Sequence, residues 1–490
     1  MSKLLALALI FLPFAAYAQT SGLPAYVSPA TQQAQQAQAA NASNASNIIT
    51  GTLSVARLPA QTVSFGSPIE QLVITAPGTY SGLRIVNHNP TRPAIQVNTT
   101  GAVIIQNSMI ESAQKGIGTM AGCNLTLTNN MGVQLPSGSS ALGGDDFLYA
   151  NSCASLSATH NTITGFAAGF YIAGWSGTNT LSIRANEIFK TDDRYPNGDR
   201  PAQAGLGHAI IVTDGSFAGG ADISYNHVQN SPFEASSEDV ININDAYGTA
   251  SNLIQVQHNL IDGAFGNVGY QYAYTGTGII TDGSGLTAFV NIANNHVVNF
   301  MNSGIETAIG HDITVAGNDT ISTGQIPNRD TAGSDFYERD WLGAFPTTSA
   351  GLTFGAGVQT CAYNSSTCYN ITASNNTSGF IGPDATGTAA RYDFANPAGN
   401  AGTSVTMAGS TSISPASETS TLSGGAVATA MAAELTAWRA EYDSANTTAP
   451  GSDKSLPGSV NGLAASSTFG AVGSIAGHMG AYLPSTADSR

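Results

Sequence analysis

Four acidic residues stand in short apolar segments in the middle of the chain. Asp214, Asp245 and Asp282 each lie near the end of such a segment, and Glu306 lies within a fourth. If the segments stack in register as neighbouring strands, the aspartates form a column with neighbours about 5 Å apart. Stacked like charges repel, so this column costs stability unless a proton or a cation relieves it. The spacing predicts Asp214, Asp245, Asp282 and Glu306 as candidate catalytic residues.

Two chemistries suit such a column, and a structural explanation competes with both. Two carboxyl groups with separated pKa values act as general acid and general base in glycoside hydrolysis. Alternatively Asp239, Asp245 and Asp282 hold Ca²⁺, which takes six to eight oxygen ligands. A polyuronate would then bind through the metal. In the structural explanation each aspartate only bonds its own backbone in a turn.

Polar and aromatic residues near these carboxylates are candidates for contacting a sugar. Two long insertions, 190–205 and 323–346, carry arginines and aromatic residues. Long loops in a compact repeat are often functional, although loop aromatics can equally shield the flank of the fold. The candidate substrate-binding residues are Asn242, Asn244, His208, Arg339 and Trp341.

The segments that must position these residues form a repeat. An apolar-x-apolar-x-x-Asn pattern recurs along the middle of the chain, and a second alternating segment precedes most copies. The period of two indicates β-strands, and a coil that cannot bury its apolar face alone must stack on copies of itself. The recurring asparagines are expected to face inward and bond one another between coils. They are Asn107, Asn130, Asn161, Asn186, Asn226, Asn259, Asn295, Asn318 and Asn376.

This pattern resembles the right-handed parallel β-helix superfamily, the pectate-lyase-like fold, over roughly residues 70 to 390. The resemblance implies an all-β solenoid. Proteins of that fold include polysaccharide lyases, polygalacturonase-like hydrolases, sugar epimerases, phage depolymerases and adhesins, so the fold does not fix the function. No polygalacturonase signature and no lyase Arg/Lys motif stands out, and no catalytic residue of a family is carried over.

The two ends of the chain differ from the repeat. Residues 1–18 read as a signal peptide, with Lys3, an apolar run and the small-x-small site Ala16-Tyr17-Ala18. Residues 19–69 are expected to be a linker and N-terminal cap region, 70–398 the β-helix and 399–490 a Gly/Ser-rich region. Both flanks are expected to be flexible. One helix is predicted at 425–443, whose apolar stripe would cap the end of the solenoid.

The four cysteines fit the repeat. Cys123 and Cys153 lie at similar distances before ladder asparagines, so a bond between them would join adjacent coils. Cys361 ends one strand and Cys368 begins the next, so their bond would clamp a turn. Export makes such bonds permissible, and no Cys/His spacing indicates zinc.

Composition narrows the function. Charged residues make up 9 % of the chain, with 15 Lys and Arg against 31 Asp and Glu. So few cations leave little from which to build a nucleic-acid-binding patch. The N-terminal apolar run is too short to span a membrane comfortably, and no other apolar stretch is long enough. The leading hypothesis is a secreted or periplasmic lyase or glycoside hydrolase acting on a polysaccharide, with Ca²⁺ as a possible cofactor. The alternative is a non-enzymatic adhesin or carbohydrate-binding solenoid. The oligomeric state stays open.

Overall fold

The computed structural model describes residues 68–446, apart from several internal segments. These segments are 136–144, 176, 193–206, 231–234, 236, 267–274, 323–325, 330–335, 340–355, 363–366, 384–388, 396–404 and 414–424. The predicted signal peptide, most of the predicted linker and the last residues of the C-terminal region therefore lie outside the described residues.

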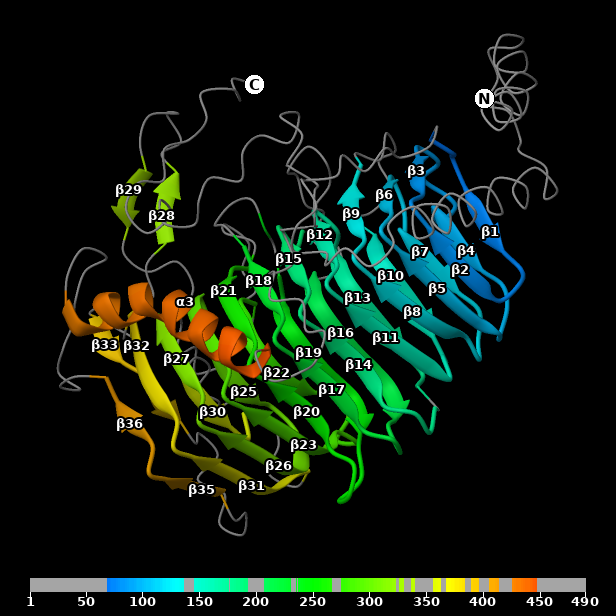
Figure 1. Ribbon diagram of the computed structural model, residues 1–490. Helices are drawn as coiled ribbons and strands as arrows, with labels where there is room; N and C mark the ends of the chain where they lie inside the picture. The colour runs from blue at the N-terminus through cyan, green and yellow to red at the C-terminus, as the bar shows by residue number, and fades with distance from the viewer. Residues whose placement is uncertain are drawn as a thin grey trace, which may run out of the picture.

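The described strands form a parallel β-helix, in which each coil contributes one strand to each of three stacks (Figure 1). The first stack contains β1 (Leu72–Ile74), β4 (Ile95–Val97), β7 (Ile117–Thr119), β10 (Asp146–Asn151), β13 (Ala168–Ala173), β16 (His208–Ser216), β19 (Asp239–Tyr247), β22 (Thr277–Asp282), β25 (Ile305–Thr307), β30 (Val358–Thr360) and β34 (Phe394–Ala395). The second contains β2 (Gly78–Ser81), β5 (Ala102–Gln106), β8 (Asn124–Thr128), β11 (Ser155–Thr159), β14 (Leu181–Arg184), β17 (Ala221–Ser224), β20 (Ile254–Gln257), β23 (Ala288–Ala293), β26 (Gly310–Ala316), β31 (Cys368–Ser374) and β35 (Val405–Ala408).

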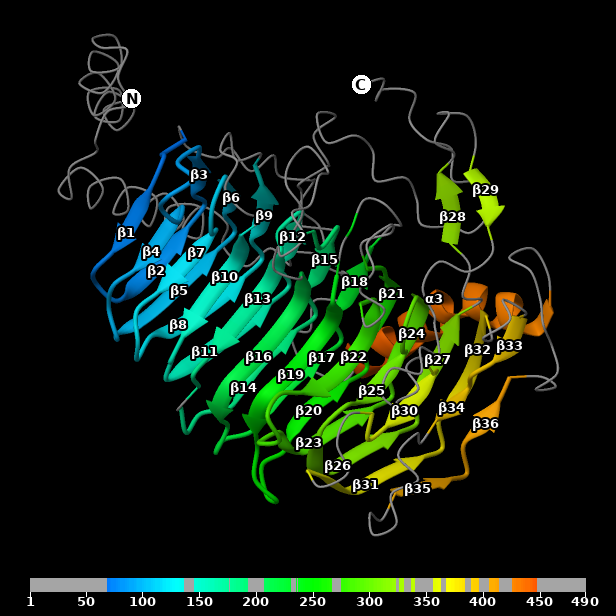
Figure 2. The ribbon, with the colours of Figure 1, turned by 180° about the vertical axis from the view of Figure 1, so that it is seen from behind.

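The third stack lies on the side of the helix α3 (Gly425–Asn446), and Figure 2 shows the stacks from behind. It contains β3 (Arg84–Asn87), β6 (Met109–Ser112), β9 (Met131–Gln134), β12 (Thr162–Thr164), β15 (Glu187–Phe189), β18 (His227–Gln229), β21 (Leu260–Ala264), β24 (His296–Phe300), β27 (Asp319–Ser322), β32 (Thr377–Pro383) and β36 (Thr411–Ser412). The remaining strands pair antiparallel: β28 (Ile326–Arg329) with β29 (Phe336–Arg339), and β33 (Ala389–Arg391) with β32. Strands β35 and β36 continue the parallel stacks beyond residue 398, where the sequence analysis ended the solenoid.

Apolar side chains from successive coils lie directly above one another inside the helix. In the first stack the column runs through Leu148, Phe170, Ile210, Ile241, Ile279, Ile305 and Val358. Each of these side chains is 0 % exposed. Strand alternation sends the residues beside them outward, so outward polar residues of the first stack share one face.

The asparagines form the inward ladder that the sequence predicts. Asn226 shows the arrangement: its Oδ1 accepts the Nδ2 and the backbone N–H of Asn186, at 2.9 and 3.1 Å. Its own Nδ2 donates to Asn259 Oδ1 and to the carbonyl oxygen of Ile183, both at 2.9 Å. The ladder runs unbroken from Asn130 to Asn376 through the other predicted members. Each buried amide is thereby satisfied.

One predicted member of the ladder is wrong. Asn107 has a positive φ of 50° and lies one residue before the ladder position, which Ser108 occupies. The backbone N–H of Ser108 donates to Asn130 Oδ1 at 3.1 Å. In every described coil the second and third strands are joined by two residues only, the first in the left-handed region and the second in the ladder. The prediction that Asn107 belongs to the ladder is therefore wrong by one residue.

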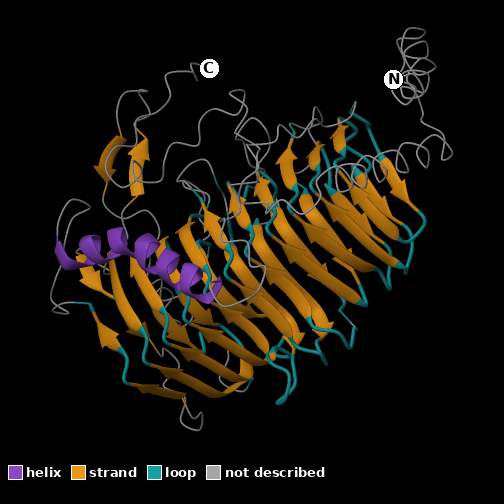
Figure 3. Ribbon diagram, viewed as in Figure 1, coloured by secondary structure: helices purple, strands orange, loops and turns teal. Residues whose placement is uncertain are grey.

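Helix α3 was expected to cap the end of the solenoid. It lies instead across the third stack (Figure 3). Its predicted apolar stripe does face the protein, where Val427 and Met431 pack on Ile321 and Ile381. Trp438 and Tyr442 are buried against Leu260, and Trp438 Nε1 donates to the carbonyl oxygen of His258 at 2.7 Å. The helix thus shields one face of the coils.

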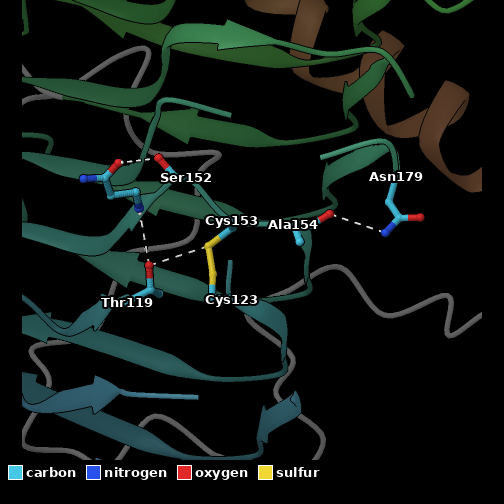
Figure 4. The surroundings of a disulfide bond; sticks show 7 residues. Thr119, Cys123, Ser152, Cys153, Ala154 and Asn179 are labelled. Atoms are coloured by element: carbon cyan, nitrogen blue, oxygen red, sulfur yellow. Dashed lines mark hydrogen bonds between the residues drawn. A yellow bond between two sulfur atoms is a disulfide. The ribbon is translucent and has the colours of Figure 1, made fainter. Parts of the chain in front are cut away.

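Both predicted disulfides are present. Cys123 and Cys153 join adjacent coils with a Cα–Cα distance of 4.5 Å, and the Thr119 hydroxyl donates to Cys153 Sγ (Figure 4). Cys361 and Cys368 are bonded across a turn with a Cα–Cα distance of 5.5 Å. Among the described residues, no helix has both the length and the apolar character needed to cross a membrane.

Candidate functional site

The register of the first stack separates the three predicted aspartates into two rows. Asn244 of β19 pairs with Thr213 of β16 on one side and with Asp282 of β22 on the other. Asp214 and Asp245 lie one residue further along, and both adopt a positive φ, 51° and 45°. Asp282 is therefore level with Asn244, and the predicted single column of three aspartates is wrong by one residue. The Thr-Asp-Gly triplets looked equivalent in sequence, but their strands end at different points.

Asp245 has a structural role, but it bonds the next coil and not, as the structural explanation had predicted, its own backbone. Its Oδ1 accepts the backbone N–H groups of Ser284 and Leu286, at 2.7 and 3.2 Å, and the Ser284 hydroxyl at 3.1 Å. Asp214 is exposed and accepts the hydroxyl of Thr213 at 2.9 Å. These bonds give both aspartates a structural role at the ends of the strands. A catalytic role is therefore not needed to explain why either aspartate is there.

A different set of carboxyl groups gathers on the outward face of the same stack. Asp239 begins β19, Asp282 ends β22 and Glu306 lies in the middle of β25. Asp239 and Glu306 are 2 % and 1 % exposed, and Asp282 is half-buried. Glu306 is level with Ile280, two residues before Asp282 on the neighbouring strand. The structure thus brings together three of the predicted site residues as one group, here called the acid cluster.

Burial raises the pKa of each carboxyl group in the acid cluster. For Glu306 it raises the pKa to about 7, with Ser303 opposing the shift and the charge of Asp282 adding to it. Within the described part of the chain, neither carboxylate oxygen of Glu306 meets a donor with good hydrogen-bond geometry. Burial also raises the pKa of Asp282, where a bond from the Gly283 backbone opposes the shift. The protonated form of Glu306 is therefore present near neutral pH.

The pKa of Asp239 is raised well above its ordinary value. Burial is the main cause, and the charges of nearby carboxyl groups add to it. These neighbours are Glu238, Asp282 and Glu306. One carboxylate oxygen of Asp239 accepts Asn242 Nδ2 at 3.0 Å. The three carboxyl groups are thus electrostatically coupled, and a proton bound to one affects the others.

The predicted substrate-binding residues fall into two groups. Asn242 lies beside the cluster at 3 % exposure, and Asn244 is level with Asp282. His208 is also buried: its Nδ1 lies 2.9 Å from the carbonyl oxygen of Asp239, and its Nε2 lies 3.7 Å from Glu238 Oε2. Burial lowers the pKa of His208 to about 4, so its imidazole is neutral at pH 7. These three side chains line the acid cluster.

The other two predicted binding residues are not placed there. Arg339 ends β29, which pairs with β28 outside the three stacks, and its side chain lies outside the described residues. Trp341 also lies outside the described residues. The structure therefore leaves both predictions untested.

The predicted calcium ligands do not form a compact set. Asp245 Oδ1 already accepts three hydrogen bonds from Ser284 and Leu286 of the next coil, and Asp239 lies at the opposite end of the same strand as Asp245. Among the described residues, one group of three His, Asp or Glu side chains has ligand atoms within 4.8 Å of one another, and it lies on the third stack. The predicted calcium site assumed that Asp239, Asp245 and Asp282 lie close together, because the aspartates had been aligned in a single column.

Asp146 is a buried carboxyl group that sequence reasoning missed. Burial raises its pKa to about 7, with the charge of Lys115 opposing the shift. It begins β10 and is level with His208 two coils further on. Tyr149 and Tyr171, from the same strand column that carries Asn242 and Glu306, lie beside it with ring centroids 5.2 Å apart. Only the strand register, absent from the sequence alone, brings this aromatic pair into line with the acid cluster.

Comparison of the chain with protein-family models, with curated proteins and with solved structures finds no match. The parallel β-helix is therefore established by the geometry of the strands.

Proposed function

We propose that this protein is an exported glycoside hydrolase of the pectate-lyase-like fold that acts on a polysaccharide through the acid cluster. The supporting observation is the burial of Asp239, Asp282 and Glu306 together on an outward sheet face. Burying carboxyl groups without full compensation destabilises the folded state. The stacked core and the asparagine ladder do not need them, so a chemical role explains their presence. Such perturbed acids often mark functional sites.

Glu306 is the proposed general acid and Asp282 the proposed general base. With a pKa of about 7, Glu306 retains a proton that it can donate to the leaving glycosidic oxygen. Asp282 is less buried, so it has access to a water molecule that it can activate. Asp239 is the proposed positioning residue, because its charge and its bond to Asn242 shape the field around the other two.

The register favours inversion at the anomeric carbon. Asp282 and Glu306 lie on neighbouring strands, two residues apart along the strand direction. Strand spacing and rise place their Cα atoms about 8 Å apart. Inverting enzymes hold their carboxyl groups roughly 6.5–9.5 Å apart to leave room for water. If the carboxyl groups keep the separation of their Cα atoms, the product has inverted configuration.

A hydrolase fits the cluster better than a lyase. Proton abstraction next to a uronate needs a base and a group that neutralises the carboxylate, commonly a cation. The ion pairs of Lys115, with Asp145 and Asp146, tie this lysine to another part of the first stack. A neutral polysaccharide also avoids repulsion from a chain with a net charge of −16.

Export of the protein is part of the proposal. The sequence of residues 1–18 has the pattern of a signal peptide. The two disulfides agree with an oxidising compartment. Processing after Ala18 in a secreting host, read by mass spectrometry of the mature protein, would test this part.

The test is depolymerisation of a panel of neutral and acidic glycans by the purified protein. New reducing ends without ultraviolet absorption of unsaturated sugars would support a hydrolase. Glu306→Gln and Asp282→Asn should each lower the rate at least about 100-fold. Asp214→Asn, at an exposed turn, is the matched control and should retain the rate. Full activity in both cluster variants would refute the assignment.

A second candidate is a carbohydrate-binding solenoid without catalysis. The Tyr149–Tyr171 pair favours it, because Lys115 lies over the Tyr149 ring at 5.2 Å and the two rings offer a stacking surface. Binding of a glycan without any product, unchanged in the cluster variants and lost in Tyr171→Ala, would select this function.

A further inference from the structure

Helix α3 covers a polar row on the third stack that the proposed hydrolysis does not use. The row consists of the residues that directly follow the ladder asparagines. In register these are Glu187, His227, Leu260, His296 and Asp319. The sequence pattern did not identify these histidines and acids as candidates, although each directly follows a ladder asparagine. The row brings imidazoles and carboxylates beneath an acidic face of the helix.

Three side chains from three different elements converge at the end of this row. His296 of β24 and Asp319 of β27 are direct register partners, and Glu434 comes from α3. His296 Nδ1 lies 2.5 Å from Glu434 Oε2 and 3.8 Å from Asp319 Oδ2. One ligand atom from each residue lies within 4.8 Å of the other two. His296 and Glu434 are buried, at 4 % and 8 % exposure.

A second observation concerns the far side of the same imidazole. His296 Nε2 lies 3.4 Å from Glu441 Oε1. The other oxygen of Glu441, Oε2, lies 3.1 Å from Nδ1 of His258. Histidines that ligate metals usually donate their second ring N–H to a carboxylate, which fixes the tautomer and orients the ring. Glu441 is placed to accept from Nε2–H of His296 when a metal ion takes the place of the hydrogen bond between Nδ1 and Glu434.

The charge balance also favours a cation. Asp319, Glu434 and Glu441 surround one imidazole, and in the described part of the chain their ion-pair partners are histidines alone. Three carboxylates therefore share two imidazoles, so at least one negative charge is left unbalanced even when both rings are protonated, and a divalent ion would balance it.

We propose that His296, Asp319 and Glu434 bind a divalent transition-metal ion, Zn²⁺ being the best match, which fastens α3 to the solenoid. One imidazole nitrogen with two carboxylate oxygens suits zinc and its neighbours better than Ca²⁺ or Mg²⁺, which prefer oxygen alone. A water molecule completes a four-coordinate site. The role is structural, because the site lies on the third stack and the acid cluster on the first.

Zinc titration of the full-length protein, stripped of metal with a chelator, tests the proposal. Calorimetry should show one site per chain, and saturation should raise the melting temperature. Co²⁺ should give a visible absorption band from the nitrogen- and oxygen-ligated ion. Ca²⁺ at the same concentration should do neither. Trypsin cleavage after Arg439, within α3, should slow when zinc is bound.

Two variants separate metal binding from helix docking. Glu434→Gln keeps an oxygen that can accept from His296 but loses the anionic ligand. His296→Asn keeps a polar atom near the position of Nδ1. Each should weaken zinc binding at least about tenfold and abolish the stabilisation by zinc, while far-ultraviolet circular dichroism reports that the solenoid stays folded.

Two matched controls should bind zinc as the wild type does. Asp443→Asn changes an exposed acid on the same helix, and Glu306→Gln changes the acid cluster. Absence of stoichiometric binding to the wild type would overturn the proposal. Binding that persists undiminished in both Glu434→Gln and His296→Asn, or that disappears in Glu306→Gln, would overturn it as well.

Discussion

Replacing Glu306 by Gln should make the protein more stable at alkaline pH, although it should abolish activity. Gln has nearly the shape of protonated Glu but cannot ionise. The pKa of Glu306 is raised from 4.5 to about 7 in the folded protein. The folded protein therefore holds this proton more tightly than the unfolded chain does, and ionisation opposes folding.

The sign and the size of the effect follow from this shift. Below about pH 4.5 the carboxyl group is protonated in both states, and no penalty exists. Between about pH 4.5 and 7 the free energy of unfolding falls as the unfolded chain releases its proton more readily. Above about pH 7 the full penalty is present, and a shift of this size corresponds to about 3 kcal/mol. Glu306→Gln should be free of that loss.

The assay is urea denaturation of wild type and variant across this pH range, followed by tryptophan fluorescence. The variant should gain stability relative to the wild type as pH rises, by up to about 3 kcal/mol, and the two should converge in acid apart from a constant offset. Asp214→Asn serves as the exposed control and should follow the wild type at every pH. A difference that does not change with pH would refute the idea that Glu306 is buried without adequate compensation.

Two further predictions concern stability. Asn226→Ala removes the acceptor of two buried donors on Asn186 and should lower the free energy of unfolding by about 2–5 kcal/mol; in urea denaturation, Asn179→Ala, which removes an exposed amide, should change it by less than about 0.5 kcal/mol. Equal effects of the two would contradict the ladder argument. Replacing Cys123 and Cys153 by Ser should cost about 3–4 kcal/mol, more than the same change at Cys361 and Cys368, because the first bond closes a loop with a sequence separation of 30 and the second one of 7. Thermal melts of both double variants would check this order.

The sequence predicted the coil and its ladder well because both depend on short-range patterns. Alternating apolar residues and a recurring asparagine define which side chains face inward, and cysteines at similar offsets from Asn130 and Asn161 define a disulfide between coils. Asn107 was misplaced since a neighbouring serine can take the ladder position. Local patterns thus fix the inward face to within one residue.

The site was harder to predict because it depends on where strands end. Asp245 and Asp282 stand in similar triplets, but the first closes a turn while the second belongs to a buried acid cluster. Glu306 was a candidate because it lies within one of the strand segments, and Asp239 because it directly precedes another. Only the register shows that the two face the same space. The contacts of the row beneath α3 join residues that are far apart in the sequence. His296 and Glu434, for example, are separated by 138 residues. No local sequence pattern reveals such a contact.

The constant two-residue junction between the second and third strands has a consequence for engineering. A residue inserted in this junction would interrupt the asparagine ladder. Insertions and deletions are therefore expected in the other junctions of the coil. The junction from the third strand to the next first strand already varies, from three residues between β12 and β13 to 35 between β27 and β30. It opens beside Asp239 and His208. This protein is therefore a scaffold on which foreign loops can be grafted next to reactive carboxyl groups while the spine that holds them stays intact.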